Sequence, residues 1–503
     1  MKTVFIFIFL GFINFFSTSA QSKHEKIDSL ISAYSAADCF NGVALVSEKG
    51  KIIYKKAVGV ADRELDVPMT TDMKFRIASI SKPFTAIIIL QLVDDGKIKL
   101  DGKITDYIPD YQGKKGDSIT IHQLLTHTSG ILQNLDPEEE AIQERLYHSL
   151  RDMVKYAEES DLYFEPGSGY HYSNLAYNLL AYIAEKVTGE TFDKLLANYI
   201  FKPLGMKNTK QCNGAQIEKN LSKGYEYKLL GGYENASYFD PSYTVGPGGV
   251  ISNVEDLCKF DKALYNRLLI SNDLYNKMFT QTKQGSYGYG WDLSKKTITN
   301  TSDTITIISH SGSINGFGSF IARIESDSTL VIVLKNNRSD SYISPAFAPV
   351  IGQEIISILY NEAVQIPKKS IAKQMGFMVG QYGIDKAIDE YYKTKELDYK
   401  YFNFDESELN KLGIELLFKF KMPQEALKVF EINMLQYPQS YNTYDSYAYV
   451  LRQIGDYQNS IKYYKLGLDV LKKYPRSNNN DSVKKDAENA LKSIKEMELK
   501  LKK

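Results

Sequence analysis

The sequence contains only three cysteines and one tryptophan, and its 61 basic residues are matched by 61 acidic ones. Three cysteines cannot form a disulfide framework, because any pairing leaves one over. We therefore expect Cys39, Cys212 and Cys258 to be free buried thiols, although the sequence does not say which two would join in an oxidising compartment. The neutral charge balance gives no electrostatic reason to expect nucleic acid as a partner.

Metal-binding motifs are also missing. The sequence has no His-Glu-x-x-His motif, and His122 and His127 lie five positions apart, which does not place two ligands on one face of a helix. We expect both histidines to be structural, and we expect neither a metal nor a cofactor. Residues 126–130, Thr-His-Thr-Ser-Gly, are expected to end a helix in a turn that supports a functional site.

Long apolar runs are absent except at the N-terminus. There, Lys2 precedes the apolar residues 4–16, and the small residues 18–20 follow them. The run is shorter than the roughly 20 residues that a membrane-spanning helix needs. The sequence predicts a cleavable signal peptide at residues 1–20, a secreted or periplasmic mature chain, and no transmembrane segment in that chain.

Two kinds of pattern divide the remaining chain at about residue 365. In residues 21–365, strand-like and helix-like segments are mixed. Residues 41–59 form two strand-like runs around a turn at Lys49-Gly50, and residues 304–337 form three more. Strands at both ends of the segment with helices between them predict an α+β domain, in which helices pack on one antiparallel sheet built from both ends.

Residues 366–503 show only helical patterns. A small residue followed one turn later by an aromatic one recurs with a spacing of 34 residues, at Ala426/Phe430 and Ser460/Tyr464, with a looser copy at Ala387/Tyr391. This period is typical of tetratricopeptide repeats, in which the small residue lets two helices approach. We predict an all-α tetratricopeptide-like domain that holds a protein partner or covers part of the cleft rim, and that supplies no catalytic residue. A chain ending near residue 363 should stay folded and active on a small ester.

Ser79 and Lys82 are the first candidate site residues. Residues three apart share a face of a helix, and Pro83 is tolerated only in the first turn, so a helix should start at this point. Ser79 would then lie at the positive end of the helix dipole, with a lysine close enough to take its proton. The alternative is a surface pair, since the same spacing recurs at Ser370/Lys373 and Ser482/Lys485.

Two later segments offer partners for this pair. Tyr172-Ser173-Asn174 leads into an apolar helical run, so a tyrosine there could share the proton of Lys82; the alternative is a simple capped helix start. His310-Ser311-Gly312 ends a strand-like run, so we expect the strand to end there. Gly312 would allow close approach of the backbone, and Ser313 could offer its N–H group to an oxyanion. His310 could also be an ordinary residue at a strand end.

Together these residues resemble a known family. Ser-Ile-Ser-Lys at 79–82, Tyr-Ser-Asn at 172–174 and His-Ser-Gly at 310–312 occur in the order of the motifs of serine β-lactamases and penicillin-binding proteins. Supporting segments at 124–131, 246–260 and 287–293 are similar to the branch that contains class C lactamases, D-aminopeptidases and lactamase-like esterases. The resemblance covers residues 23–363 and implies the β-lactamase/transpeptidase-like fold.

The resemblance also implies roles. Ser79 is the nucleophile, Lys82 the base and Tyr172 the proton shuttle, while Asn174 binds the acyl side of a small-molecule or peptide substrate. His310, Gly312 and Ser313 line the substrate site, and the N–H groups of Ser79 and Ser313 form the oxyanion hole.

His310 departs from the lysine of the lactamases, and histidine is largely neutral at pH 7. We therefore expect small esters or D-amino peptides and amides as substrates rather than β-lactams. The alternative is a non-catalytic penicillin-binding, sensing or interaction protein with the same fold. Trp291 lies either in the core or in the cleft.

Overall fold

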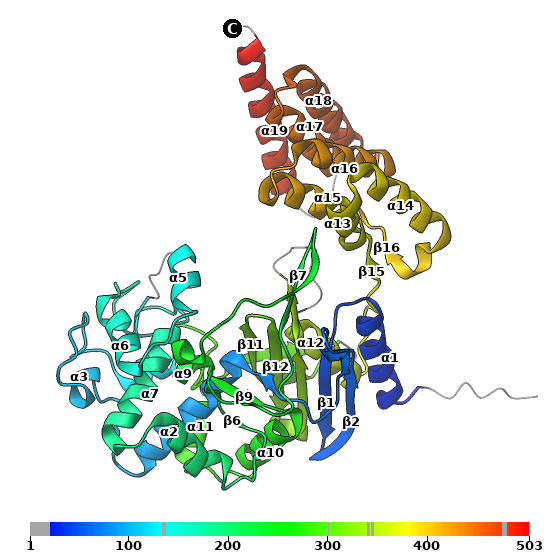
Figure 1. Cartoon of the computed structure of the whole chain (residues 1–503). Helices are drawn as coiled ribbons and strands as arrows, with labels where there is room; N and C mark the ends of the chain where they lie inside the picture. The colour runs from blue at the N-terminus through cyan, green and yellow to red at the C-terminus, as the bar shows by residue number, and fades with distance from the viewer. Residues whose placement is uncertain are drawn as a thin grey trace, which may run out of the picture.

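The computed structural model describes residues 21–132, 137–299, 301–339, 343, 347–474 and 480–501; the predicted signal peptide at residues 1–20 lies outside them. The chain forms an α+β domain from which a stack of helices projects at one side (Figure 1). None of the helices in these described ranges is long and apolar enough to cross a membrane.

The main sheet has six antiparallel strands in the order β10-β11-β12-β13-β1-β2. Their bounds are β1 (Gly42–Glu48), β2 (Lys51–Val58), β10 (Asp292–Thr297), β11 (Thr304–Ile314), β12 (Phe317–Ile324) and β13 (Thr329–Lys335). The β1–β2 hairpin turns at Lys49-Gly50, and β1 pairs with β13 from the far end of the domain. The prediction of one sheet built from both ends of the segment is confirmed.

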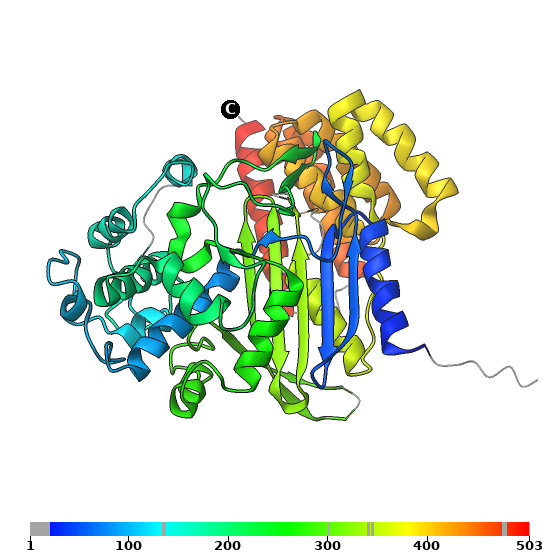
Figure 2. The same ribbon diagram turned by 60° about the horizontal axis from the view of Figure 1, so that its bottom comes forward.

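Both faces of this sheet are covered by helices (Figure 2). Successive side chains of a strand point to opposite faces, so Val43 and Leu45 of β1 join the larger core, whereas Ala44 and Val46 join the core beneath α1 (Lys23–Ala36) and α12 (Ala348–Leu359). The larger core lies under the helical lobe, whose helices are α2 (Lys82–Asp94), α3 (Ile104–Tyr107), α4 (Ile121–Leu125), α5 (Pro137–Gln143), α6 (Leu150–Glu159), α7 (Asn174–Thr188), α8 (Phe192–Leu196), α9 (Val245–Gly248), α10 (Val254–Tyr265) and α11 (Asn272–Met278). Trp291 is fully buried in this core, which decides between its two alternatives.

Two small three-stranded sheets lie beside the main one. One contains β5 (Phe75–Arg76), β9 (Val250–Ser252) and β6 (Lys210–Gln211), and another contains β14 (Asn337–Ser339), β7 (Tyr225–Lys228) and β8 (Gly232–Asn235). Two short pairs, β3 (Val60–Asp62) with β4 (Val67–Pro68) and β15 (Lys369–Ser370) with β16 (Phe402–Asn403), complete the strands of the described residues.

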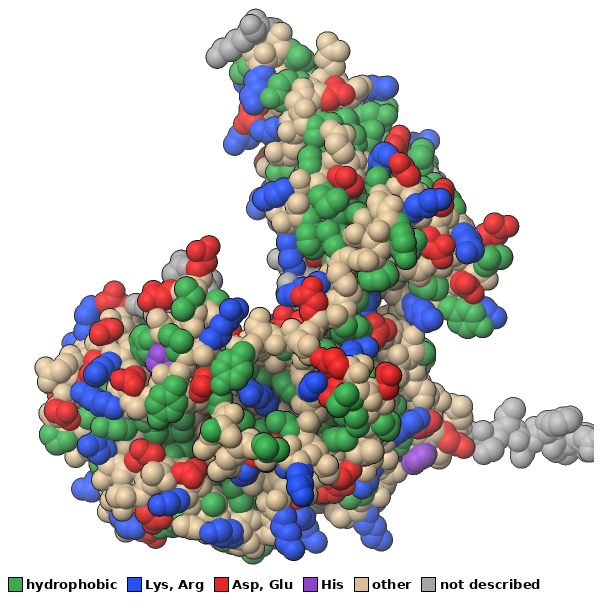
Figure 3. All heavy atoms as spheres, viewed as in Figure 1, with side chains coloured by type: hydrophobic (Ala, Val, Ile, Leu, Met, Phe, Trp, Pro, Cys, Tyr) green, Lys and Arg blue, Asp and Glu red, His purple; other side chains and the backbone are tan. Residues whose placement is uncertain are grey.

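The rest of the described chain is a stack of helices, α13 (Ile371–Tyr382), α14 (Ile384–Leu397), α15 (Glu406–Ile414), α16 (Pro423–Gln436), α17 (Tyr441–Gln453), α18 (Tyr457–Lys473) and α19 (Asn480–Leu501). All six side chains of the 34-residue pattern are at most 3% exposed. Charged and apolar side chains are mixed over the visible face of the stack (Figure 3). The all-helical character is confirmed, and the assignment as tetratricopeptide-like stays a prediction.

Candidate active site

Ser79 lies at the bend where the chain passes from β5 into α2. Residues Ala78–Ser81 form a 3₁₀ turn, α2 follows at Lys82, and Pro83 occupies its first turn as the sequence predicted. Ala78, directly before Ser79, has a left-handed backbone with φ +48°. A residue with a Cβ adopts this conformation at a cost of about 1 kcal/mol or more, and such strain concentrates at functional sites.

Lys82 is fully buried and directs its amine at three oxygen atoms. Its Nζ lies 3.2 Å from Ser79 Oγ, 2.8 Å from Asn174 Oδ1 and 3.2 Å from the carbonyl oxygen of Pro247. Burial lowers the pKa of Lys82 well below its ordinary value, because a charged amine loses its hydration there. The alternative of a surface pair is therefore wrong.

The other Ser-x-x-Lys copy that the structure describes in full has a different use. Ser370 caps α13, and its Oγ accepts a hydrogen bond from the backbone N–H of Lys373 at 3.0 Å. The Ser482/Lys485 pair falls where the side chain of Ser482 lies outside the described atoms. Spacing alone therefore does not separate a nucleophile from a helix cap.

Tyr172 and Asn174 flank the start of α7. Ser173 is the N-cap and accepts a hydrogen bond from the N–H of Ala176, so this segment is both a capped helix start and part of the site. The ring of Tyr172 lies 4.5 Å from Lys82 Nζ. Burial raises the pKa of Tyr172, and the neighbouring Ser79 side chain opposes this only partly, so the phenol keeps its proton at neutral pH.

His310-Ser311-Gly312 lies inside β11, which corrects the expectation that the strand ends there. The strand continues to Ile314 because β12 still pairs with it, Gly312 opposite Ser319. A Cβ at position 312 would lie 2.3 Å from the carbonyl oxygen of Ile77. Glycine therefore lets the strand run against the segment that carries Ser79, as the sequence suggested, and Ser313 follows at an exposed position.

His310 has both ring nitrogens engaged within the protein. Its Nδ1 lies 2.7 Å from the carbonyl oxygen of Ser311 and its Nε2 lies 2.7 Å from the hydroxyl of Tyr287. Burial, followed by the charge of Lys82, lowers the pKa of His310 to about 3. The ring is therefore neutral. Nδ1–H donates to Ser311, and Tyr287 donates to Nε2.

Residues that the sequence undervalued complete the site. His127 is fully buried and has its ring 4.3 Å from that of Tyr172 and 4.6 Å from that of Tyr287. Its Nδ1 accepts the N–H of Ser173 at 3.1 Å, so the turn after α4 fixes the start of α7. Tyr287 was part of a supporting segment only, and the carbonyl of Pro247 has no side-chain signal that would mark it.

Residues 27–344 match the Beta-lactamase family. The chain belongs to this family. Penicillin-binding protein 4* of Bacillus subtilis is 29% identical over 380 residues, which cover 70% of this chain and 80% of that protein. Esterase EstB of Burkholderia gladioli is 32% identical over 259 residues, 46% of this chain and 66% of that protein. Among solved structures, a D-amino acid amidase from Ochrobactrum anthropi SV3, complexed with L-phenylalanine amide, has a TM-score of 0.60 at 25% identity, covering 67% of this chain and 99% of that one.

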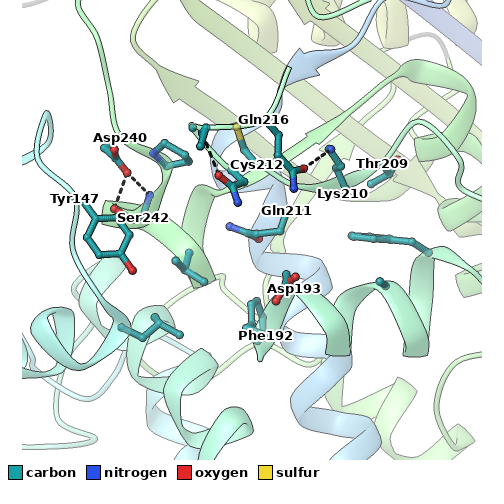
Figure 4. Close-up of a pocket in the computed structure, with 18 of the residues that line it drawn as sticks. Tyr147, Phe192, Asp193, Thr209, Lys210, Gln211, Cys212, Gln216, Asp240 and Ser242 are labelled. Atoms are coloured by element: carbon teal, nitrogen blue, oxygen red, sulfur yellow. Dashed lines mark hydrogen bonds between the residues drawn. The ribbon is translucent and has the colours of Figure 1, made fainter. Parts of the chain in front are cut away.

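A cavity of about 1210 Å³ in the helical lobe of this β-lactamase-family chain is lined by residues other than Ser79, Lys82 and Tyr172. Its walls come from α6, α8, β6 and residues 238–245, with Gln211 opposite Asp240 and Ser242 (Figure 4). Val245 lines the cavity and lies two residues before Pro247, whose carbonyl oxygen accepts a hydrogen bond from Lys82. The segment 245–247 therefore connects the cavity wall to the Lys82 contact. Cys212 also lines it. As expected, no disulfide joins the three cysteines, all of which lie in the described ranges, but they are half-buried rather than buried.

Proposed function

We propose that this chain is an exported serine hydrolase that works through an acyl-enzyme on Ser79. The proposed substrates are small esters and D-amino peptides or amides, with β-lactam-like compounds as poor substrates. The observation that carries the proposal is the arrangement of three acceptors around the buried amine of Lys82. It supports a base that is held by two acceptors and aimed at the third.

The proton count explains this role. A neutral amine has two N–H groups and one lone pair. Asn174 Oδ1 and the Pro247 carbonyl accept the two N–H groups, which turns the lone pair toward Ser79 Oγ. Burial favours the neutral amine, so Lys82 takes the proton of Ser79 as its Oγ attacks the carbonyl carbon of the substrate.

Tyr172 is the proposed proton donor for the leaving group. Its ring lies beside Lys82 and it neighbours Ser79, so it passes a proton to the leaving alcohol or amine and regains one from the lysine. The N–H groups of Ser79 and Ser313 stabilise the oxyanion. Asn174, whose Oδ1 is held by Lys82, turns its amide nitrogen toward the acyl side of the substrate.

His310 supports the choice of substrates. A neutral imidazole with both nitrogens bonded offers neither charge nor a free donor to a substrate carboxylate. We assign it to holding Tyr287 and β11 rather than to attracting an anion. An esterase and a D-amino acid amidase among the similar proteins agree with this choice.

A fluorophosphonate probe tests the proposal. The wild-type chain should be labelled at Ser79, and Ser79→Ala should not be labelled. Ser370→Ala is the matched control, because it removes the serine of another Ser-x-x-Lys pair and should leave labelling unchanged. Equal labelling of wild type and Ser79→Ala, or none in either, would favour the alternative of a non-catalytic sensing or interaction protein.

A substrate panel tests the finer assignment. Turnover of p-nitrophenyl esters or D-aminoacyl anilides should exceed turnover of nitrocefin by at least about 100-fold, since the site has no fixed cation for a carboxylate. Nitrocefin turnover equal to that of the esters contradicts it. Export is tested separately, by finding residue 21 as the N-terminus of the mature protein by mass spectrometry.

We also propose the domain division, with the hydrolase domain at 21–365 and the helical domain at 366–503. All the side chains described around Ser79 precede residue 365. We therefore expect the helices to contribute no group that contacts the reacting atoms.

A further inference from the structure

One hairpin of the hydrolase domain enters the helical domain. Its strands are β7 and β8, and its tip is Leu229-Leu230 (Figure 1). Leu229 is fully buried in the apolar core that also contains Ile371 and Met375 of α13. The carbonyl of Leu230 accepts a hydrogen bond from Gln381 at 3.2 Å. The tip is thus packed as part of the helical core.

Two glycines of α13 form the seat for this tip. A Cβ at position 376 would lie 2.3 Å from a terminal carbon of Leu229, and a Cβ at position 380 would lie 2.0 Å from the carbonyl oxygen of Leu230. Glycine in a helix interior costs about 1 kcal/mol relative to alanine. The close approach of the hairpin explains why Gly376 and Gly380 occupy these positions.

Polar contacts hold the strands of the hairpin as well. The hydroxyl of Tyr227 donates to the carbonyl of Lys373, whose amine lies 3.9 Å from the centre of the Tyr227 ring and forms an ion pair with Asp38. Tyr233 of β8 donates to the same aspartate. The hairpin is therefore fixed to α13 along its length.

The base of the hairpin meets the turn between β11 and β12. Gly316 in that turn has φ +75°, and a Cβ there would lie 2.6 Å from Gly224 Cα and 2.7 Å from Ala236 Cβ. A Cβ at Gly224 would in turn lie 3.1 Å from the carbonyl oxygen of Asn315. Ser313 lies near the end of β11, two residues before this turn. The base of the β7–β8 hairpin therefore contacts the end of the strand that carries Ser313.

We propose that the helical domain positions the oxyanion-binding end of β11, because α13 holds the hairpin tip and the hairpin base holds the β11–β12 turn. Leu229, Leu230, Gly376 and Gly380 are positioning residues in this scheme, since none of them contacts the reacting atoms. The proposal rests on the proposed function for the role of Ser313, but the mechanical link from α13 to the turn is testable without it.

The test uses the full chain with Gly380→Ala, and with Gly413→Ala as the matched control. The control also adds a Cβ to a glycine of the helical domain, where it would meet the Phe430 ring at 2.4 Å, inside the helical stack and away from the hairpin. Alanine favours helix at both sites, so a loss comes from the contact and not from propensity.

Gly380→Ala should lower kcat for a small ester about tenfold at an unchanged KM. The expected loss is a fraction of the 10²–10³ that complete removal of an oxyanion donor costs, and the effect falls on the transition state alone. Hydrogen exchange of residues 312–318 should rise in Gly380→Ala and stay at the wild-type level in Gly413→Ala. A kcat of Gly380→Ala equal to that of the control overturns the proposal.

A double variant separates a loss of the hairpin contact from a general loss of folding. Gly376→Ala should lower kcat through its collision with Leu229, and adding Leu229→Ala should restore part of the loss because it removes the colliding carbons. Two losses that only add together would overturn the proposal. If the wild type takes no fluorophosphonate label, the proposed function fails, and the exchange comparison alone still decides whether the hairpin seat is linked to the turn.

Discussion

The catalytic cluster and the helical domain both bury aromatic side chains, but against different neighbours. Near Ser79, the rings of Tyr172, Tyr287 and His127 pack together, with Tyr172 beside the buried amine of Lys82, and burial shifts the pKa values of all three rings. In the helical stack, aromatic residues such as Phe430 and Tyr464 fill space beside small residues. Around Ser79 the protein buries titratable groups at a cost in desolvation, which is typical of a functional site. In the helical stack the aromatic side chains only fill space in the core.

The largest effect should come from Lys82→Met, which keeps the length of the side chain and removes the amine. We expect acylation of Ser79 to slow by about 10²–10⁴-fold, the range for losing a general base. The thermal midpoint should also fall, because Asn174 Oδ1 and the carbonyl of Pro247 lose their buried donor, at about 1–3 kcal/mol for an unsatisfied group. Single-turnover labelling measures the rate, and a loss under tenfold would show that another group takes the proton.

Gly312→Ala should follow in size. The new Cβ would collide with the carbonyl of Ile77 and with Ser319 Oγ, so β11 must move away from Ser79. We expect kcat/KM for an ester to fall about 100-fold, comparable to losing one oxyanion donor. Gly318→Ala, across the ladder from Ser313, is the control, since its Cβ would meet the flexible side chain of Lys335 at 3.2 Å and Ala348 Cβ at an ordinary contact distance of 4.0 Å. Equal activity of the two variants would show that Gly312 has no special role in the active site.

The start of α2 shows what the sequence could predict. Ser79, Lys82 and Pro83 are close in sequence at the start of a helix, so their spacing predicts that Ser79 and Lys82 lie close together, and the structure agrees. Strand pairs joined by short turns were equally accessible, as the β1–β2 hairpin shows. Local chain geometry determined both features.

Features that depend on distant packing were not predictable. The carbonyl of Pro247 holds Lys82 across 165 positions, and backbone atoms have no residue signature. The continuation of β11 through Gly312 depends on its pairing with β12, and the seat of Leu229 on α13 depends on how the two domains meet. In each case the deciding partner lies far away in the chain.

The catalytic cluster should make the stability of the chain depend on pH, because it contains the buried histidines His310 and His127. His310 has a pKa of about 3 when folded against 6.5 ordinarily, so the unfolded chain binds a proton between these values and the folded chain does not. Stability should therefore fall as pH falls from about 6.5 toward 3, with His310 contributing up to about 1.4 kcal/mol per pH unit. His127 acts in the same direction, because its pKa is also lowered.

Denaturant unfolding at pH 7, 6 and 5 checks this dependence, with His310→Asn as the variant. The variant should lose stability more slowly than the wild type as pH falls, by the slope that one proton contributes. Carboxylates titrate equally in both proteins, so the difference between the two slopes isolates His310. Parallel slopes would show that the pKa of His310 is the same in the folded and the unfolded chain.

The smallest effect should come from Ser460→Ala in the helical domain. Ser460 is fully buried, and its Oγ donates to the carbonyl of Ala448 at 2.7 Å, so the variant loses one hydrogen bond worth about 0.5–1.5 kcal/mol. Ser460→Leu should cost about 1–3 kcal/mol, because the site holds only a small side chain. Neither change should alter ester turnover, since Ser460 belongs to α18 and bonds α17, whereas the hairpin tip rests on α13. Thermal unfolding measures both variants. If alanine cost more than leucine, the polar group rather than the size would matter, and the tetratricopeptide-like interpretation of the 34-residue period would fail.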